Sequence, residues 1–318
     1  MLGISLPVRR LRKAIDHGQL ALVYQPKADM RSGRVVGVEA LARWNSPRFG
    51  LVSPDEFIPR AERSPRTLEA LTEWALNCAF EQAREWQRVG HQLTVAVNLS
   101  PSSILDSVLV EKFAELLERW EVPANLIQVE LTETAVFGVT AFERVAETLR
   151  GLSRLGLLLA LDDFGTGYSS LTHLRDLPID KIKIDKSFVL RMDERPNDAL
   201  IVRSVIALAK SLGLRVVAEG VERETVWRRL SELGCDVAQG NYLSRPLPPD
   251  ELIAWVRQWE ELYAEAHRMA AELLERRLGI PDRRAGLNDR RERRESSRFV
   301  PKSARPAVRT SAPPDREQ

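Results

Sequence analysis

The sequence predicts an α/β protein of the (β/α)8 barrel type, and three observations support this fold class. Short apolar runs alternate with amphipathic helical segments along most of the 318 residues, which is typical of a mostly parallel sheet covered by helices. Eight such runs fall within about 240 residues, which fits a closed barrel by number and length. Polar side chains follow nearly every run. The rival fold, a doubly wound open sheet, would place its chemistry at one switch point.

The predicted elements follow one another in a regular order. A short basic helix is expected from about Val8 to His17, with Gly18 as its C-cap. Strands are expected at residues 20–26, 35–44, 93–100, 127–133, 157–163, 181–185, 215–220 and 236–240. Helices are expected at residues 54–61, 67–89, 107–120, 140–155, 198–212 and 224–233. Apolar residues three or four positions apart, such as Leu68, Leu71 and Ala75, are the basis for the helices.

The last predicted helix begins near Asp250 and continues to about Leu278. Its apolar stripe, from Leu252 to Leu274, fits either a final barrel helix that overruns the sheet or a helix that pairs with a partner. We expect a lead at residues 1–10, a barrel domain at residues 11–258 and a helical extension at residues 259–280.

The C-terminal residues 281–318 differ in composition from the rest. They carry 11 Lys and Arg against 6 Asp and Glu, whereas the remainder carries 36 against 39. Because this basic tail is rich in Arg, Ser and Pro and poor in apolar residues, we expect it to be disordered. It is either a solvated tail or a tether for an anionic partner, whose identity the sequence does not give. The mildly acidic body argues against a surface for polymeric nucleic acid.

The N-terminus and the cysteines give no sign of export. The stretch MLGISLPVRRLRK lacks the apolar segment of a signal peptide, and no apolar run approaches the length of a transmembrane helix. Cys78 and Cys235 match no metal or redox spacing and are interpreted as reduced structural thiols. The sequence therefore predicts a cytoplasmic protein without a transmembrane segment.

Polar side chains recur where the predicted strands end. They are Glu39, Asn98, Glu130, Asp162, Asp163, Glu219 and Gln239, with Lys183 inside the short run KIKID. In a barrel these strand ends converge on the face where barrel enzymes hold their active sites. Five carboxylates cannot be held together without cations, and Mg²⁺ and Mn²⁺ prefer oxygen ligands. Two such cations would suit the hydrolysis of a phosphate ester.

Each of these residues alone also has an ordinary structural explanation. Asp162 could cap the next helix, Lys183 could form a structural ion pair, and Asn98 could start a turn. The recurrence over many strands is what favours a site. None of the four histidines ends a strand, which argues against zinc or a histidine-based nucleophile. We expect Asp163 to lie where the chain leaves the sheet, so that it and Asp162 can both reach the cations.

Seven motifs occur in a fixed order along the chain. They are EALAR (39–43), VNLS (97–100), ELTE (130–133), DDFGTGYSSL (162–171), KIDKSF (183–188), VVAEGVE (216–222) and QGNYLSRPLP (239–248). Together they resemble the EAL-domain phosphodiesterases, which hydrolyse the bacterial second messenger cyclic di-GMP to linear pGpG. The resemblance runs from about Leu11 to Val256. It implies a modified (β/α)8 barrel with one antiparallel strand, two Mg²⁺ or Mn²⁺ ions, cyclic di-GMP as substrate, and a homodimer.

The resemblance also implies a role for each matched residue. The implied metal ligands are Glu39, Asn98, Glu130, Asp162, Asp163 and Glu219. Glu39, Asp163, Lys183 and Glu219 are the implied catalytic residues, with Lys183 holding and polarising the attacking water. The implied substrate contacts are Gln25, Leu41, Arg43 and Gln239. Glu133 is implied to anchor the loop at residues 164–170, which would link the active site to the dimer interface.

Three positions depart from the family pattern. Asn241 stands where an aromatic residue is common, Lys27 stands where an apolar residue is usual, and Ser64–Arg66 replaces a glycine-containing turn. None of them is an implied metal ligand, so we expect effects on substrate affinity and loop detail rather than on the chemistry. The alternative function is a receptor that binds cyclic di-GMP without hydrolysing it. Such receptors typically lack an acidic ligand or the lysine, and no matched ligand is missing here.

Overall fold

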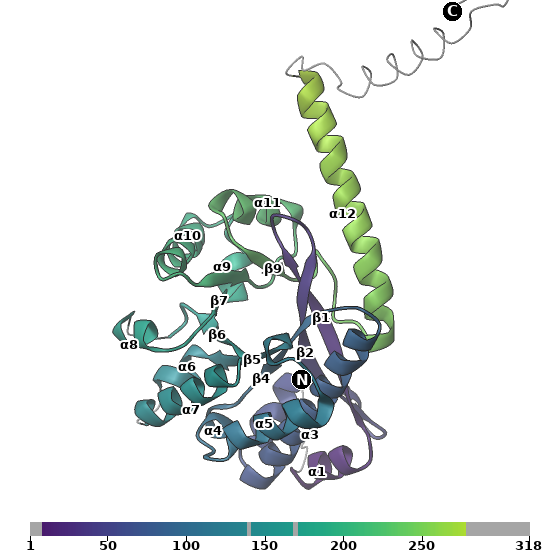
Figure 1. The fold of residues 1–318 in the computed structure, drawn as a ribbon, viewed down its shortest axis with the longest axis vertical. Helices are drawn as coiled ribbons and strands as arrows, with labels where there is room; N and C mark the ends of the chain where they lie inside the picture. Colours follow the sequence, from purple (N-terminus) through teal and green to yellow (C-terminus); the bar gives the residue numbers. More distant parts are fainter. Residues whose placement is uncertain (1–7, 139–140, 168–170, 278–318) are drawn as a thin grey trace, which may run out of the picture. The chain divides into compact units, whose positions relative to one another are not determined.

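A computed structural model describes residues 8–138, 141–167 and 171–277 of the chain. The predicted tail, residues 281–318, and most of the predicted lead lie outside the described residues. The chain divides into two compact units, Met1–Tyr263 and Ala264–Gln318, and the first contains a barrel of strands with helices around it (Figure 1). The fold class that the sequence predicts is confirmed.

The strands are β1 (Leu20–Asp29), β2 (Val35–Ser46), β3 (Gly50–Val52), β4 (Thr94–Asn98), β5 (Ile127–Thr132), β6 (Leu158–Phe164), β7 (Lys181–Ile184), β8 (Arg215–Ala218) and β9 (Val237–Gln239). The longer helices are α1 (Val8–Asp16), α2 (Pro54–Ala61), α3 (Pro65–Arg88), α5 (Leu109–Trp120), α7 (Phe142–Arg154), α10 (Pro196–Ser211), α11 (Glu224–Leu233) and α12 (Pro249–Arg277). Short helices are α4 (Pro101–Ile104), η1 (Ala124–Leu126), α6 (Glu133–Phe137), α8 (Leu171–Asp176) and α9 (Lys186–Val189).

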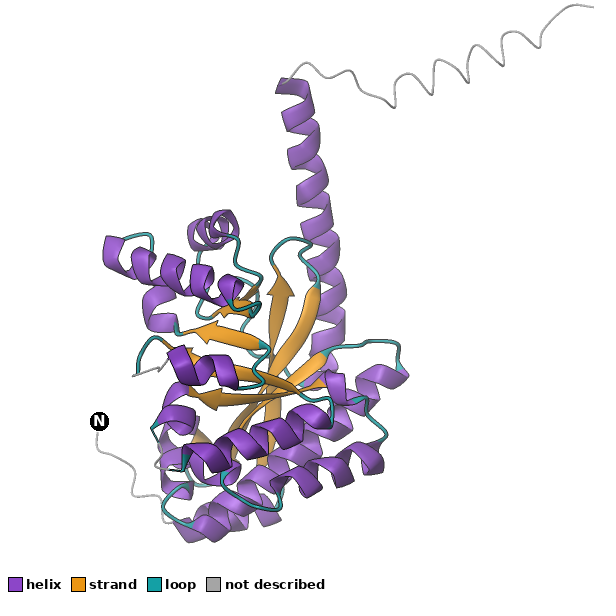
Figure 2. Cartoon of the chain, turned by 60° about the vertical axis from the view of Figure 1, so that its left-hand side comes forward, coloured by secondary structure: helices purple, strands orange, loops and turns teal. Residues whose placement is uncertain are grey.

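Eight strands close into a barrel in the order β1-β9-β8-β7-β6-β5-β4-β2, and β2 pairs again with β1. The strand β1 is antiparallel to both of its neighbours, and each other neighbouring pair in the ring is parallel. The short β3 adds to β2 as an extra antiparallel strand. Figure 2 shows the strands surrounded by helices. The expected single antiparallel strand is therefore β1.

The turn between β1 and β2 explains why β1 runs against the others. Only a short turn joins the two strands, and consecutive strands joined in this way must be antiparallel. The Asp29 carboxylate accepts hydrogen bonds from the amide of Ser32 at 2.9 Å and from its hydroxyl at 2.8 Å. Gly33 then takes a left-handed conformation with φ of 71°, which glycine adopts without strain. The local sequence DMRSG therefore sets the direction of the first strand.

The face of the barrel wall that the helices cover is apolar, as expected for parallel strands packed against helices. Val129, Leu159, Ile182 and Val216 are fully buried and belong to one large apolar core shared with the surrounding helices. A second, smaller cluster lies between α1, α2, α3 and the start of the β1–β2 hairpin; its members include Leu11, Trp44, Phe57 and Leu71. The polar residues of the strands therefore gather on the other face, inside the barrel.

Several predicted boundaries are wrong, and the reasons are local. The strand predicted at 127–133 ends at Thr132, because the Thr132 hydroxyl caps α6 by accepting the Ala135 amide at 3.2 Å. The strand predicted to end at Trp44 continues to Ser46, because β3 pairs with it there. The sequence analysis missed β3 and the short helices α4, α6, α8 and α9, which are too short to show a period.

The first half of α12 packs on the β1–β2 turn. Its Leu252 and Val256 are buried. The Trp259 indole donates to the carbonyl of Gly33 at 2.8 Å, and the Tyr263 hydroxyl donates to the carbonyl of Met30 at 3.1 Å. These contacts are those of a final barrel helix, as one reading of its apolar stripe predicts. Helical pairing of the stripe with a partner stays a prediction. Among the described helices, none has the length and apolarity needed to cross a membrane.

Candidate active site

The strand register brings the predicted polar residues to one level of the barrel. Asn98 on β4 pairs with Glu130 on β5, and Gln25 on β1 pairs with Glu39 on β2. One expectation needs correction, because Glu39 lies in the middle of β2 and not at its end. The antiparallel pairing with β1 carries β2 well past this level. The shared feature is therefore the height in the barrel and not the end of each strand.

Lys183 lies at the centre of the site and is fully buried. Its ammonium group is 2.6 Å from a carboxylate oxygen of Glu130, 2.8 Å from one of Asp162 and 2.6 Å from one of Glu219. A carboxylate oxygen of Glu39 lies 3.7 Å away. A buried ammonium is tolerated only when such partners compensate for its lost hydration. Four strands thus deliver their acids to one lysine.

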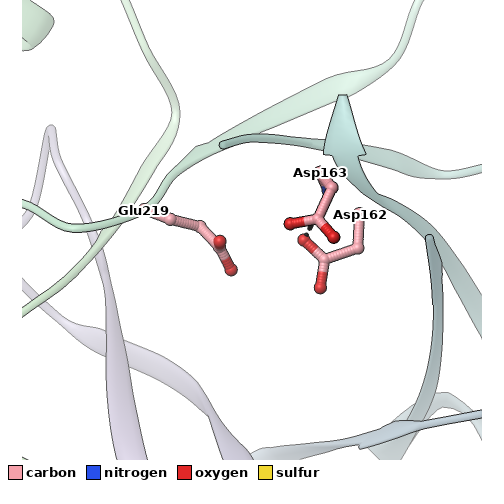
Figure 3. Close-up of side chains that lie close together, drawn as sticks. All are labelled: Asp162, Asp163 and Glu219. Carbon is pink, nitrogen blue, oxygen red and sulfur yellow. Dashed lines mark hydrogen bonds between the residues drawn. The ribbon is translucent and has the colours of Figure 1, made fainter. Parts of the chain in front are cut away.

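Asp162 and Asp163 reach the same side of β6 through an irregularity in the strand. The pairing of β6 with β7 shifts between Leu161 and Phe164, and Asp163 has a φ of 55°. A bulge of this kind re-aims a side chain that strict alternation would turn away. Figure 3 shows both carboxylates near Glu219. Asp163 thus lies near the end of β6, which continues one residue further to Phe164, and the bulge is what frees its side chain from strict alternation.

Glu39 is held by amide side chains. Its Oε1 accepts a hydrogen bond from Asn98 at 2.7 Å, and its Oε2 accepts one from Gln239 at 2.6 Å. The same amide group of Gln239 also donates to the Gln25 side chain at 3.0 Å. The Gln239 Oε1 is buried and has no hydrogen-bond partner among the described residues. A buried acceptor without such a partner fits a group that brings a donor, such as a water or a ligand.

Crowding of the carboxylates shifts their proton affinities. Burial, with Asp162 and Asp185 next to it, raises the pKa of Asp163 to about 6. Burial also outweighs the attraction of Lys183 and raises the pKa of Glu219 to about 8, and it raises the pKa of Asp162. For Glu130, burial is outweighed by Lys183 and Lys27, which lower its pKa to about 2. One lysine therefore does not neutralise the whole cluster.

The donor set fits hard divalent cations. Asp162, Asp163 and Glu219 each offer a carboxylate oxygen, and these three atoms lie within 4.8 Å of one another. Mg²⁺ and Mn²⁺ prefer oxygen ligands of this type. Burial, together with the neighbouring acids, raises the pKa of all three acids, so their charged forms are disfavoured without a further positive charge. A bound cation would supply it.

Glu133 begins α6 and reaches under the loop that follows β6. Its side chain is almost fully buried, and its Oε2 accepts the backbone amides of Gly165 at 3.0 Å and Gly167 at 3.2 Å. A Cβ on Gly167 would come within 2.9 Å of the Glu133 carboxylate, so a larger residue there would have to displace that side chain. The structure thus places Glu133 where a loop anchor would be. Residues 168–170 of the predicted loop lie outside the described residues.

Three of the four predicted substrate residues lie on β1 and β2 beside the acids, and the fourth, Gln239, ends β9. Glu39, Leu41 and Arg43 alternate along β2 and so share one side of it. The Arg43 guanidinium is half-buried and donates to the carbonyl of Ala42 at 2.9 Å. Burial lowers the pKa of Arg43, against the pull of Glu39. Gln25 donates from its own amide to the carbonyl of Ser244 at 3.2 Å.

The sequence analysis missed polar residues that contact the implied ligands. Lys27 and Gln128 both donate to the Oε1 of Glu130, and Asp185 is hydrogen-bonded to Asp163. Lys181 donates to the Oε1 of Gln128 at 2.5 Å. A signal was present in the sequence, since Gln128 and Lys181 each stand two residues before a site residue and so point the same way. Lys27 appeared only as a departure from the family pattern.

Comparisons with known proteins agree with this geometry. Residues 8–246 match the EAL domain family. The cyclic di-GMP phosphodiesterase PA2567 of Pseudomonas aeruginosa is 39% identical over 237 residues, which cover 74% of this chain and 40% of that protein. The bifunctional diguanylate cyclase/cyclic di-GMP phosphodiesterase MucR of the same species is 39% identical over 247 residues, or 77% of this chain and 36% of that protein.

A solved structure shows the same fold. The structure of the PaMucR phosphodiesterase in complex with c-di-GMP superposes with a TM-score of 0.74 at 38% identity, covering 78% of this chain and 100% of that chain. The chain spans about two fifths of the length of the two curated relatives. With the family match over most of the barrel, these similarities show that the chain belongs to the EAL domain family.

Proposed function

We propose that this protein hydrolyses cyclic di-GMP to linear pGpG with the help of divalent cations. The observation that carries the proposal is the cluster of five carboxylates and Asn98 around the fully buried Lys183 at one level of an EAL-family barrel. The named relatives PA2567 and MucR support the substrate. The cytoplasmic location and the homodimer stay predictions.

In the proposed site, Glu39, Asn98, Glu130, Asp162, Asp163 and Glu219 would hold two Mg²⁺ or Mn²⁺ ions. Such ions, when bound, neutralise negative charge and make a water more nucleophilic at neutral pH. The water adds to one phosphorus, the bond from that phosphorus to the ribose 3′ oxygen breaks, and a proton passes to the leaving oxygen. Lys183, as the central hydrogen-bond donor of the cluster, would hold and polarise the water.

The remaining residues would position the dinucleotide. Arg43 would face a phosphate oxygen, a role for which a planar guanidinium is well suited. Gln25 and Leu41 line the same two strands, and the unpaired Oε1 of Gln239 would accept a hydrogen bond from water or ligand. Glu133 would hold the loop after Asp163 through the two glycine amides.

Product analysis tests this proposal directly. Purified protein is incubated with cyclic di-GMP and Mg²⁺ or Mn²⁺, and the nucleotides are separated by ion-exchange chromatography. We expect pGpG from the wild type and at least a hundredfold less from Glu39→Ala and Lys183→Ala, in line with losses on removing one transition-state stabilising group. Tight binding of cyclic di-GMP without pGpG above the level of the variants would instead support the non-hydrolysing receptor.

A further inference from the structure

Lys27 is an unusual neighbour for an implied metal ligand. It lies on β1, points into the barrel and is 5% exposed, among Val36, Val38 and Ala96. Its ammonium group forms an ion pair with the Oε1 of Glu130 from the side away from Lys183. The space beneath it is about 10 Å³, which holds no more than one water. The charge of Lys27 is therefore screened by the carboxylate and not by solvent.

Both oxygens of Glu130 are engaged in this arrangement. The Oε1 accepts hydrogen bonds from Lys27 and, at 2.5 Å, from the Gln128 amide. The Oε2 accepts one from Lys183 at 2.6 Å. Glu130 is fully buried. To bind a cation through both oxygens, its carboxylate would have to rotate and would lose the hydrogen bonds from Lys27 and Gln128, with little water nearby to replace them. Lys27 and Gln128 thus leave only the Oε2 for a cation.

We propose that Lys27 is a positioning residue that restricts Glu130 to one oxygen and weakens divalent-cation binding at this site. This inference rests on the proposed function, because it concerns the same cations. Two effects of Lys27 would weaken cation binding. A cationic donor on the far oxygen withdraws charge from the carboxylate, and its own charge repels a cation across a region of low dielectric.

Charge balance shows what such a residue would achieve. The five carboxylates carry five formal negative charges, which Lys183, Lys27 and the neighbouring Lys181 reduce to two. Two divalent cations would then leave two positive charges to meet the single negative charge of one phosphodiester. Without Lys27 the loaded site would carry one positive charge. Lys27 thus favours a site that attracts the phosphate over one that binds cations as tightly as possible.

The test measures Mn²⁺ affinity without substrate. Lys27→Met keeps the length of the side chain among its apolar neighbours and removes the charge. We expect Mn²⁺ to bind this variant about tenfold more tightly in isothermal titration calorimetry at pH 7, in line with the effect of residues that contact metal ligands. Lys181→Met is the matched control, because Lys181 carries the same charge but contacts Gln128 and not Glu130. It should change the affinity by less than about threefold.

Each outcome decides the inference. Unchanged or weaker Mn²⁺ binding by Lys27→Met, or an equal gain in Lys181→Met, would overturn it. Should Lys27→Met lack a cooperative thermal transition, Lys27→Gln replaces it, since glutamine keeps a donor without the charge and should also bind Mn²⁺ more tightly. A wild type that binds no Mn²⁺ would contradict the proposed function together with the inference. If the wild type binds Mn²⁺ and Lys27→Met binds it with the same affinity, the inference alone is contradicted.

Discussion

Lys183 shows at the scale of one residue why the site requires added charge. A fully buried lysine surrounded by four carboxylates satisfies its own ammonium group but leaves the acids with a net negative charge. Burial alone would lower the pKa of Lys183, and the carboxylates outweigh it and raise this pKa. Repulsion among the acids must destabilise the folded protein without cations. Cation binding then stabilises the fold and prepares the site together.

The raised pKa values of Asp163 and Glu219 make the stability of the cation-free protein depend on pH. The pKa of Asp163 rises from 3.8 to about 6 and that of Glu219 from 4.5 to about 8, so both bind protons more tightly in the folded state than in the unfolded chain. Their contribution to stability is complete below the unfolded values and is lost as pH rises through the folded values. In EDTA, the free energy of unfolding should therefore fall between about pH 4 and pH 8.

Urea unfolding at several pH values, with EDTA or with Mn²⁺, measures this effect. The fall should disappear in Mn²⁺, since a bound cation favours the charged acids. Asp163→Asn should flatten the part of the curve between pH 4 and pH 6. A free energy of unfolding that rises from pH 5 to pH 8 in EDTA would contradict the prediction. The lowered pKa of Glu130, about 2, acts below this window.

Single residues also show how far the sequence could predict the site. The doublet Asp162 and Asp163 was visible because two acids follow an apolar run. The bulge that turns both carboxylates to one side could not be predicted, because hydrophobic periodicity does not reveal the positive φ at Asp163. The contact of Lys27 with Glu130 joins β1 and β5 across the closed barrel, so it cannot be read from local spacing. The contact of Gln128 with Glu130 joins residues two apart on β5 and could have been.

At the scale of elements, the contact between α6 and the loop after β6 predicts a role for Glu133. Glu133→Gln weakens the acceptor of the Gly165 and Gly167 amides without changing the size of the side chain. Because hydrogen bonds to a charged group contribute about 1.5–3 kcal/mol, we expect this loop to open more often. Amide hydrogen exchange at residues 164–167 should accelerate about tenfold or more.

The exposed Glu232 provides a matched control for this loop prediction. Glu232→Gln removes the same charge far along the chain on α11, and exchange at residues 164–167 should remain as in the wild type. Unchanged exchange in Glu133→Gln would show that the loop is held by other contacts. Turnover of cyclic di-GMP should fall together with the loop protection if the loop aligns Asp163.

The packing of the β1–β2 turn predicts that one methyl group added at Gly33 lowers the stability of the protein strongly. A Cβ on Gly33 would lie 1.9 Å from the Tyr263 ring, so Gly33→Ala must displace α12 or the turn. Gly18→Ala is the control, because Gly18 has a φ of 64° against 71° for Gly33 but nothing within 4 Å of the added atom. We expect Gly18→Ala to lower the free energy of unfolding by about 1–2 kcal/mol, the cost of the left-handed backbone.

Gly33→Ala should lower the free energy of unfolding by about 2 kcal/mol more than Gly18→Ala, because overpacking adds to the same backbone strain. Urea unfolding followed by circular dichroism measures both variants. Equal losses would mean that α12 yields freely at Tyr263.

The helices α2 and α11 match their predicted bounds at residues 54–61 and 224–233, since clear signals at their ends define them. The Tyr263 contact could not be predicted, because it joins segments far apart in sequence.

At the scale of the whole molecule, the extent of the folded domain is the open prediction. The sequence analysis placed its end at residue 258, within the continuous apolar stripe of α12. The first compact unit extends to Tyr263. The Trp259 indole and the Tyr263 hydroxyl bind the β1–β2 turn, and Trp259 also packs against Trp227 and Tyr242. A stripe shows which side of a helix is apolar, but it does not show where the partner surface ends.

Two shortened chains distinguish these boundaries. A chain ending at Tyr263 keeps both hydrogen bonds and the aromatic contacts, so its free energy of unfolding should stay within about 1 kcal/mol of the full chain. A chain ending at Gln258 loses Trp259 and Tyr263 and should be less stable by about 3 kcal/mol or more, the usual cost of removing a packed aromatic side chain. Far-UV circular dichroism in urea compares them independently of tryptophan fluorescence. Equal stability of the two chains would place the end of the domain at residue 258, and the contacts of α12 with the β1–β2 turn would then contribute little to the fold.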